Sequence, residues 1–135
     1  MIRTIWVNGC FDVLHHGHLR LLKHAATLGD RLVVGIDSDD RVRSMKGEGR
    51  PINGHAFRKE LLESFSFIDK VYVFESDHQL EEYIRMNAPH AMVIGDDYYD
   101  RQESIIGGRE CEMVVFFRKV PNVSTTEIIK KIKNG

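Results

Sequence analysis

The chain has 135 residues, of which 42% are hydrophobic and 29% are charged, the composition of an ordinary globular domain with a buried core. Its formal net charge of -1 gives no general attraction to nucleic acid or to an anionic membrane. No apolar run approaches the roughly 20 residues that a membrane helix needs, and the N-terminus lacks the apolar stretch of a signal peptide. We therefore expect one cytoplasmic domain, residues 1–135, with Cys10 and Cys111 as free thiols.

Short apolar runs alternate along the chain with segments of helical periodicity. In chain order, the runs expected to form strands are residues 4–7, 31–36, 70–74, 91–95 and 112–117. The segments expected to form helices are residues 14–28, 57–65, 77–86 and 124–135. Gly29 is expected to end the first helix, and Ser124 with Glu127 has the capping-box pattern at the start of the last one.

The strand runs are rich in Val and Ile and mostly continuous, which is typical of strands buried on both faces. Their alternation with helices predicts an α/β fold: a single Rossmann-like domain with a five-stranded parallel sheet and helices on both faces. Such sheets bind ligands beyond the carboxyl ends of their strands, where the strand order reverses. The first strand ends near Asn8, so Gly9, Cys10 and Phe11 are expected to line that crevice.

Three histidines, His15, His16 and His18, stand at the expected start of the first helix. Free backbone N–H groups and the helix dipole favour an anion there. Gly17 has no side chain, so a phosphate can approach the main chain closely. His15 and His18 flank this point and can donate hydrogen bonds to phosphate oxygens. The pattern predicts a site for a phosphate whose negative charge rises during a reaction.

Other interpretations of the histidine cluster have less support. With Cys10 it offers zinc ligands, but zinc ligands on a helix usually stand at i and i+4 and the second half of a set is missing, so no metal site is expected. A histidine acid or base lacks an obvious nucleophile, and there is no G-x-S-x-G elbow. No G-x-G-x-x-G follows the first strand, which excludes an NAD-dependent dehydrogenase. A cluster of surface histidines is the remaining alternative.

Two further segments have residues suited to a phosphate. Residues 46–55, KGEGRPINGH, form a long polar segment with three glycines, typical of a functional or mobile loop. Ser124 and Thr125 begin the last helix, whose N-terminus is a second anion site. Asp12, in the turn after the first strand, can bind a substrate or an ion, or can brace the turn.

The H-x-G-H sequence preceded by NGCFD resembles the signature of the nucleotidyltransferase superfamily that includes cytidylyltransferases, pantetheine-phosphate adenylyltransferase and class I aminoacyl-tRNA synthetases. The segments SDDRVRSMKGEGRPINGHAFR and VSTTEIIKKI are similar to the adenylyltransferase domain of ADP-heptose synthase. The likeness runs from about Ile5 to Lys133. The order and spacing of the three motifs make it specific for the superfamily.

The resemblance implies transfer of a nucleoside monophosphate from a nucleoside triphosphate, ATP favoured, to a small phosphorylated sugar such as heptose 1-phosphate. The acceptor phosphate attacks the α-phosphorus in line and pyrophosphate leaves. The resemblance implies catalytic roles for His15, His18 and Lys46. It further implies Mg²⁺ bound with the triphosphate, and a homodimer.

The resemblance also implies binding roles for other residues. Arg58 and Asp12 are expected to hold the substrate phosphate. Ser124 and Thr125 are expected at the β- or γ-phosphate, and Asp96 and Asp97 near the base. The residues expected to bind the nucleotide are Gly9, Cys10, Phe11, Gly17, Asp96, Asp97, Ser124 and Thr125.

Departures from the heptose enzymes leave alternatives open. Residues 95–99, GDDYY, are closer to glycerol-3-phosphate cytidylyltransferases, so CTP with glycerol 3-phosphate is the second candidate pair. Those enzymes place an arginine before S-T-T at a spacing that Arg118 misses by one residue. A nucleotide-binding sensor without turnover is the alternative of another class. Because the heptose enzymes are commonly fused to a sugar kinase, a separate kinase or a different acceptor is expected.

Overall fold

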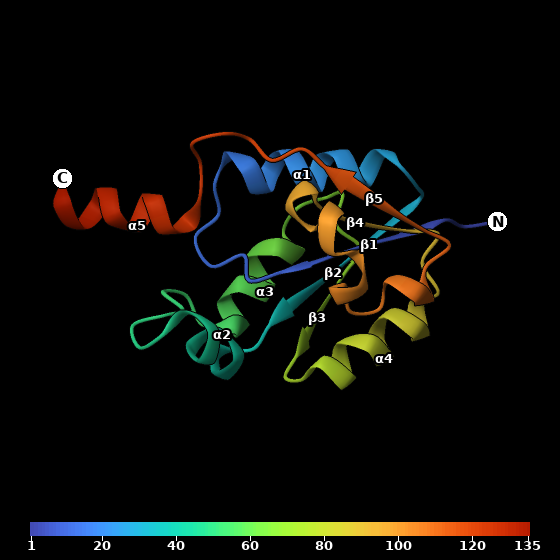
Figure 1. Ribbon diagram of the computed structural model, residues 1–135, viewed down its shortest axis with the longest axis horizontal. Helices are drawn as coiled ribbons and strands as arrows, with labels where there is room; N and C mark the ends of the chain where they lie inside the picture. Colours follow the sequence, from blue (N-terminus) through green and yellow to red (C-terminus); the bar gives the residue numbers. More distant parts are fainter.

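Five parallel strands form the centre of the structure, a computed structural model that describes residues 1–135 (Figure 1). They stand in the order β3-β2-β1-β4-β5, which confirms the predicted parallel α/β sheet. The strands are β1 Thr4–Gly9, β2 Arg31–Asp37, β3 Lys70–Phe74, β4 Ala91–Gly95 and β5 Met113–Phe117. The helices are α1 His16–Thr27, α2 Asp39–Lys46, α3 His55–Glu63, α4 Asp77–Asn87 and α5 Thr125–Asn134, with 3-10 segments at Asp96–Ser104 and Gly108–Glu110.

The central strand β1 shows why both faces of the sheet are covered. Ile5 and Val7 belong to one buried core, which also contains Leu22 of α1 and residues of α3. Trp6, between them, belongs to a second core with Ile84 of α4. Alternate side chains of a strand point to opposite faces, so α1 and α3 cover one face and α4 covers the other. The predicted helices on both faces are confirmed.

The strand order reverses between β1 and β4. The chain passes from β1 to β2 and β3 on one side, then returns through α4 to β4 on the other side. The carboxyl ends of β1 and β4, Gly9 and Gly95, therefore diverge into different connections. This leaves the crevice in which sheets of this type bind ligands.

Helix α2 and its loop differ from the sequence prediction. Ser38 caps this eight-residue helix by accepting a hydrogen bond from Arg41 N, and Asp39 and Asp40 lie in its first turn. Val42 is its one buried residue. A helix with a single apolar contact has no periodic pattern, and hydrophobic periodicity missed it. Lys46 is the last residue of this helix rather than a loop residue.

The end of α1 also differs from the prediction. Leu28 is the C-cap, in a right-handed conformation, and Gly29 does not have the positive φ of a helix-ending glycine. Instead, a Cβ on Gly29 would lie 2.6 Å from the Arg3 carbonyl oxygen and 2.8 Å from Ile5 Cγ1. Gly29 is therefore required by close packing between the end of α1 and the start of β1.

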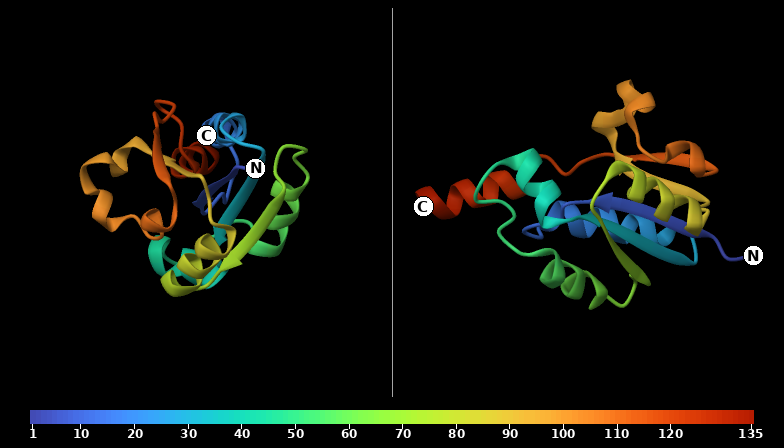
Figure 2. Two further views of the ribbon diagram at one scale, coloured as in Figure 1. Left: turned by 90° about the vertical axis from the view of Figure 1, so that its right-hand side faces the viewer. Right: turned by 90° about the horizontal axis from the view of Figure 1, so that it is seen from below.

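Helix α5 projects away from the rest of the molecule, at the end opposite the N-terminus (Figures 1 and 2). None of its residues is buried, and Ile132 is 74% exposed. Its first turn is nevertheless attached to the body, because Thr125 Oγ1 donates a hydrogen bond of 3.0 Å to the Val13 carbonyl oxygen.

The packing of Gly29 predicts that Gly29→Ala lowers the free energy of unfolding by about 1–3 kcal/mol, because the new methyl group has no space. Denaturant unfolding measures the change. Gly54→Ala is the matched control: Gly54 has a φ of -63° and its Cβ would lie 3.5 Å from Asp39 Oδ2, an ordinary contact. It should cost less than about 1 kcal/mol. Equal losses in the two variants would contradict the packing argument.

Candidate active site

A cavity of about 440 Å³ lies beyond the carboxyl ends of β1 and β4. All the predicted site residues line it except Asp96 and Arg58. Those that line it are Gly9, Cys10, Phe11, Asp12, His15, Gly17, His18, Lys46, Asp97, Ser124 and Thr125. Segments far apart in the sequence thus meet at the predicted crevice.

The turn between β1 and α1 positions the histidine pair. Phe11 adopts a left-handed backbone conformation, φ 49°, and its ring is 4% exposed. That ring lies 5.1 Å from the His18 ring, centroid to centroid. A Cβ on Gly9 would lie 3.3 Å from the Phe11 ring, so the absence of a side chain at Gly9 leaves space for that ring. Phe11 therefore supports His18 from the core side.

His15 and His18 cap the start of α1 with their rings. His15 Nδ1 accepts a hydrogen bond of 3.1 Å from Gly17 N, and His18 Nδ1 accepts one of 3.2 Å from His15 N. The two rings stack with centroids 3.8 Å apart. A Cβ on Gly17 would lie 3.0 Å from the His15 ring, so Gly17 gives space to the imidazole as well as to a ligand. The Gly17 N–H, expected to face a phosphate, is used in this cap.

These hydrogen bonds determine which nitrogen of each ring carries the proton. A ring nitrogen that accepts from a backbone N–H carries no proton, so each neutral ring has its proton on Nε2 and can donate from that atom. Burial, with a contribution from His15, lowers the pKa of His18 to about 4. Burial, with a contribution from His16, also lowers the pKa of His15. The site therefore holds two neutral N–H donors at pH 7.

Asp12 is the anchor of the loop that follows α2. Its side chain is almost fully buried, and Oδ2 accepts from Arg50 Nε (3.0 Å) and Ile52 N (2.8 Å). Oδ1 accepts from Asn53 N at 2.8 Å, and the Asn53 amide donates to the Asp12 carbonyl oxygen. Both carboxylate oxygens of Asp12 thus brace the loop, which is one of the two roles that the sequence left open.

Arg58 lies inside the protein rather than on the cavity wall. It is 1% exposed, and its Nη1 donates to the carbonyl oxygens of Cys10 (2.8 Å) and Asp37 (2.9 Å). Nε donates to the Asn53 carbonyl oxygen, and Nη2 donates to Asp39 Oδ1. Four of its N–H groups are thus used internally. The sequence predicts that Arg58 holds a substrate phosphate. In the structure, its side chain instead joins the β1–α1 turn to the loop.

Asp39, whose side chain is 33% exposed, completes this network at its outer edge. Burial by itself would raise the pKa of Asp39. The hydrogen bond from Arg58, together with the backbone N–H and charge of His55, outweighs this effect and lowers the pKa. Its carboxylate therefore stays ionised beside the guanidinium.

Lys46 and Arg50 bring cations to the cavity. Lys46 is exposed and forms no ion pair with a carboxylate of the chain. Arg50 also lines the cavity, and its ion pair with Asp12 leaves the other two guanidinium nitrogens without an internal partner. Arg50 was not among the predicted site residues. Its place in the polar loop beside Lys46 was a signal, but its pairing with Asp12 is visible only in three dimensions.

The start of α5 closes the cavity from the opposite side of the turn. Ser124 Oγ accepts from Glu127 N at 3.1 Å and caps the helix. The Ser124 hydroxyl proton remains free to donate to a ligand. Thr125 uses its hydroxyl proton toward Val13, so it can only accept from a ligand while that bond persists.

The two aspartates after β4 are not equivalent. Asp97 lines the cavity, and its Oδ1 lies 3.2 Å from Lys119 Nζ. Asp96 is exposed and does not line the cavity. Gly95 permits this arrangement, because a Cβ there would lie 2.6 Å from Asp97 Oδ1. Of the two, only Asp97 therefore faces the cavity.

The cysteines are free, as predicted. Burial, reinforced by Asp37, raises the pKa of Cys10 to about 11. Burial, reinforced by Glu110, raises the pKa of Cys111 to about 11. A protonated thiol is a poor nucleophile, so Cys10 lines the cavity without the character of a catalytic thiolate.

No group of three or more His, Cys, Asp or Glu side chains is arranged to hold a metal ion. None of the helices has the length and apolar character needed to cross a membrane.

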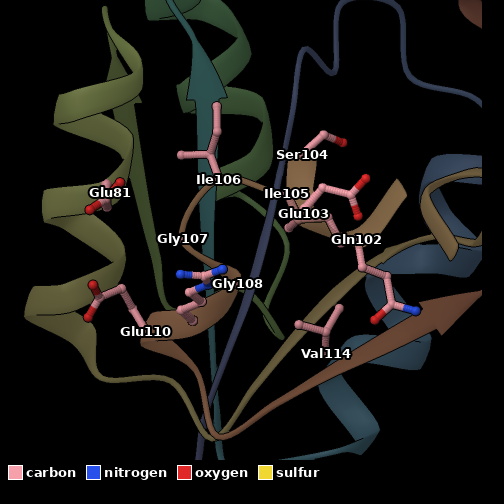
Figure 3. A pocket seen from close by; sticks show the side chains of 11 residues that line it. Glu81, Gln102, Glu103, Ser104, Ile105, Ile106, Gly107, Gly108, Glu110 and Val114 are labelled. Atoms are coloured by element: carbon pink, nitrogen blue, oxygen red, sulfur yellow. The ribbon is translucent and has the colours of Figure 1, made fainter. Parts of the chain in front are cut away.

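A second cavity, of about 550 Å³, lies between α4 and the 3-10 segments (Figure 3). Its walls carry Glu81, Glu103 and Glu110, with Arg109 as a cation. Arg85 forms ion pairs with Glu81 and Glu110. None of the predicted site residues lies there.

The parallel sheet, the reversed strand order and the paired imidazole donors beside free cations define a nucleotidyltransferase domain. Residues 6–131 match the family described as Cytidylyltransferase-like, and the chain belongs to that family.

Curated relatives are similar to nearly the whole of this chain. The Bifunctional protein HldE of Vibrio cholerae is 41% identical over 137 residues, which is 98% of this chain and 28% of that protein. The protein of the same name from Campylobacter jejuni is 39% identical over 132 residues, with the same two coverages. The chain thus spans about 28% of the length of these relatives.

Solved structures support the fold. The lipopolysaccharide core biosynthesis protein from Thermoplasma volcanium superposes with a TM-score of 0.73 at 23% identity, covering 89% of this chain and 99% of that one. A protein of unknown function from Archaeoglobus fulgidus superposes with a TM-score of 0.67 at 20% identity, covering 90% and 93%.

The depressed pKa of His18 predicts loss of stability in acid. Between pH 6.5 and about 4, the unfolded chain binds a proton at this residue that the folded chain does not bind. The contribution of His18 to the free energy of unfolding is therefore complete above pH 6.5 and is lost as the pH drops toward 4. The loss is on the order of 1–3 kcal/mol, since the ring is partly exposed to water.

Denaturant unfolding at pH 7 and pH 4.5 measures this effect. In His18→Asn the fall should be smaller than in the parent, because the amide does not titrate. His78→Asn, at an exposed histidine on α4, should keep the parent's full pH dependence. A fall of the same size in His18→Asn and the parent would show that His18 does not carry the effect.

Proposed function

We propose that this chain transfers a nucleoside monophosphate from a nucleoside triphosphate to the phosphate of a small sugar or polyol, releasing pyrophosphate. ATP with heptose 1-phosphate is the favoured pair. The observation that carries the proposal is the fixed orientation of His15 and His18. Both Nδ1 atoms accept hydrogen bonds from the backbone, so both rings are held in place and both Nε2–H groups remain available. Two fixed donors side by side suit the oxygens of one polyphosphate.

The surrounding groups suit the rest of the triphosphate. Lys46 and Arg50 supply positive charge from one wall, and the start of α5 supplies the Ser124 hydroxyl and the helix dipole from the other. Since the cations sit on flexible or paired side chains, the histidines are the most rigidly placed donors in the cavity.

In the proposed reaction an oxygen of the acceptor phosphate attacks the α-phosphorus, and the bond from this phosphorus to the β-bridging oxygen breaks. The new phosphoanhydride and pyrophosphate are the products. The attacking phosphate is already ionised, so no general base is needed. The neutral Nε2–H groups of His15 and His18 would donate to the oxygens on which charge accumulates. His18, held between Phe11 and His15, would be the more precisely oriented donor.

Mg²⁺ is proposed to arrive with the triphosphate as part of the substrate. Asp97 is paired with Lys119 and Asp12 is engaged in bracing, so the chain offers no carboxylate cage. Mg²⁺ binds readily through phosphate oxygens and water with few protein ligands, which fits this cavity.

The choice of heptose 1-phosphate rests on the HldE relatives and on the NGCFD and KGEGRP segments. The G-D-D-aromatic sequence at residues 95–98 favours the second candidate, CTP with glycerol 3-phosphate. Asp97 faces the cavity from this sequence, so it is the residue on which the choice of base is proposed to depend.

Pyrophosphate release from ATP, CTP, GTP and UTP, each with heptose 1-phosphate and with glycerol 3-phosphate in the presence of Mg²⁺, tests the proposal. ATP with heptose 1-phosphate should be the most active pair. His18→Ala should lower kcat by about 10²–10³-fold, the usual effect of removing one donor to developing charge. His78→Ala should match the parent, because His78 is an exposed residue of α4.

Turnover by His18→Ala at the parent's rate would remove the catalytic assignment. Activity with CTP and glycerol 3-phosphate alone would select the second pair. Nucleotide binding without pyrophosphate release from any pair would favour a sensor.

We also propose that the chain forms a homodimer through α5. Ile128, Ile129 and Ile132 form one side of this helix. The first two are half-buried, and Ile132 is 74% exposed. Figure 1 shows α2 and the segment after it at the end of the molecule from which α5 projects. That segment and the start of α3 carry the exposed apolar side chains of Ile52 and Phe57, each 52% exposed. A two-fold pair of chains would let each α5 cover that surface on its partner.

Charge supports this pairing. The polar side of α5 carries Lys130, Lys131 and Lys133, whereas α3 and the segment before it carry the exposed Glu48, Glu60 and Glu63. Opposite charges at the rim of an apolar contact favour its formation and fix its orientation.

Light scattering of the purified chain should give the mass of a dimer. Ile132→Glu should shift it toward the monomer by placing a charge in the apolar contact. Met86→Glu is the matched control, because Met86 is 70% exposed on α4, away from the proposed contact, and it should leave the dimer intact. A monomeric parent, or equal dissociation of the two variants, would contradict the proposal.

A further inference from the structure

A groove of about 940 Å³ lies beside the candidate active site, between α1 and the segment that follows β5. Figure 1 shows this segment running beside α1 on its way to α5. The groove and the active-site cavity share Phe117, Lys119 and Val120. The two spaces therefore lie on either side of the same short stretch of chain.

The charge of the groove is of one sign. Its cations are Arg20 and Lys23 on the α1 wall and Arg118 and Lys119 on the other wall; His16 and His24 also line it. No Asp or Glu lines it, although the chain as a whole has 20 acidic and 19 basic residues. Four lysine and arginine side chains with no carboxylate among them give the groove a local positive potential.

Most of these cations have no counterion in the protein. Arg20, Lys23 and Arg118 form no ion pair with any carboxylate of the chain, and Arg20 Nε donates instead to His16 Nε2 at 3.3 Å. Only Lys119 is paired, with Asp97 Oδ1 at 3.2 Å. The free cations are therefore available to an anion from solution.

The polar side chains of α1 form a stripe that suits an extended anion. Two cations, Arg20 and Lys23, stand in the middle of the stripe, and two hydrogen-bonding side chains, His16 and Thr27, stand at its ends. The eleven steps of helix from His16 to Thr27 cover about 16 Å. A single phosphate would meet one or two of these side chains, whereas a chain of linked phosphates would meet several.

The floor of the groove is apolar. Phe117 packs against His24 with ring centroids 5.4 Å apart, and Leu19, Val120 and Pro121 also face the groove. A ligand with both a planar or apolar part and linked phosphates would contact the floor and the cations together.

We propose that this groove is an accessory site for a di- or triphosphate group, separate from the reaction site and divided from it by residues 117–120. The ligand is a small molecule with linked phosphates: either inorganic pyrophosphate or a second nucleotide. The inference goes beyond the proposed function, since binding in the groove does not require turnover.

Calorimetric titration of the full chain, without acceptor, tests the site with ATP, pyrophosphate and AMP as separate ligands. ATP should give two binding events per chain, the second from the groove. Arg20→Gln/Lys23→Gln should weaken the second event at least about tenfold and leave the first unchanged, because both cations face only the groove. Arg3→Gln/Lys70→Gln removes the same charge from exposed positions outside the groove and should retain both events.

The three ligands separate the sources. Two events with pyrophosphate identify the product as a ligand of the groove, and two events with ATP alone identify a nucleotide. AMP should lack the second event. The proposal is overturned by a single event with both ATP and pyrophosphate, by a second event that survives in Arg20→Gln/Lys23→Gln, or by AMP filling the groove as tightly as ATP. Loss of turnover with the second event retained would refute the proposed function alone.

Discussion

The structure of the site depends on how the first turn of α1 satisfies its backbone N–H groups. Most helices begin with a Ser, Thr, Asp or Asn cap, whereas this one begins with two imidazoles. His15 and His18 each accept a backbone hydrogen bond on Nδ1, and this single arrangement fixes the tautomer, the orientation and the mutual stacking of the rings. Because a cap is part of the fold, the two Nε2–H donors are positioned before any ligand arrives.

The rest of the site is attached to this turn through a buried polar network. Asp12 holds the loop after α2 through three hydrogen bonds to its carboxylate, and Arg58 joins the same loop to the carbonyl oxygens of Cys10 and Asp37. Arg50, which faces the cavity, is thereby fixed relative to the histidines. Buried charges of this kind persist when they are paired and fully hydrogen-bonded, and every buried side-chain N or O atom here has a partner.

The sequence predicted what depends on periodicity and on local motifs. The apolar runs identified all five strands, and the loop-to-helix position of H-x-G-H placed the histidines correctly at the end of β1. It could not predict which charged residues face inward. From the sequence, Arg58 and Asp12 are candidates for holding a substrate phosphate. In the structure, both side chains brace the interior instead, through hydrogen bonds to residues about 40 positions away. Helix α2 was missed because a single apolar contact, Val42, leaves no period.

The neutrality of the histidines has a consequence for how the cavity handles charge. An empty site with two protonated imidazoles 3.8 Å apart would suffer strong repulsion, and burial removes that cost by keeping both rings neutral. A bound polyphosphate would favour protonated rings, but a second proton on either ring would have to go onto Nδ1, which already accepts a backbone N–H. Protonation would therefore break a hydrogen bond of the helix cap, so the cap itself keeps both rings as neutral Nε2–H donors. The positive charge beside a polyphosphate comes instead from Lys46 and Arg50, whose side chains carry a permanent charge.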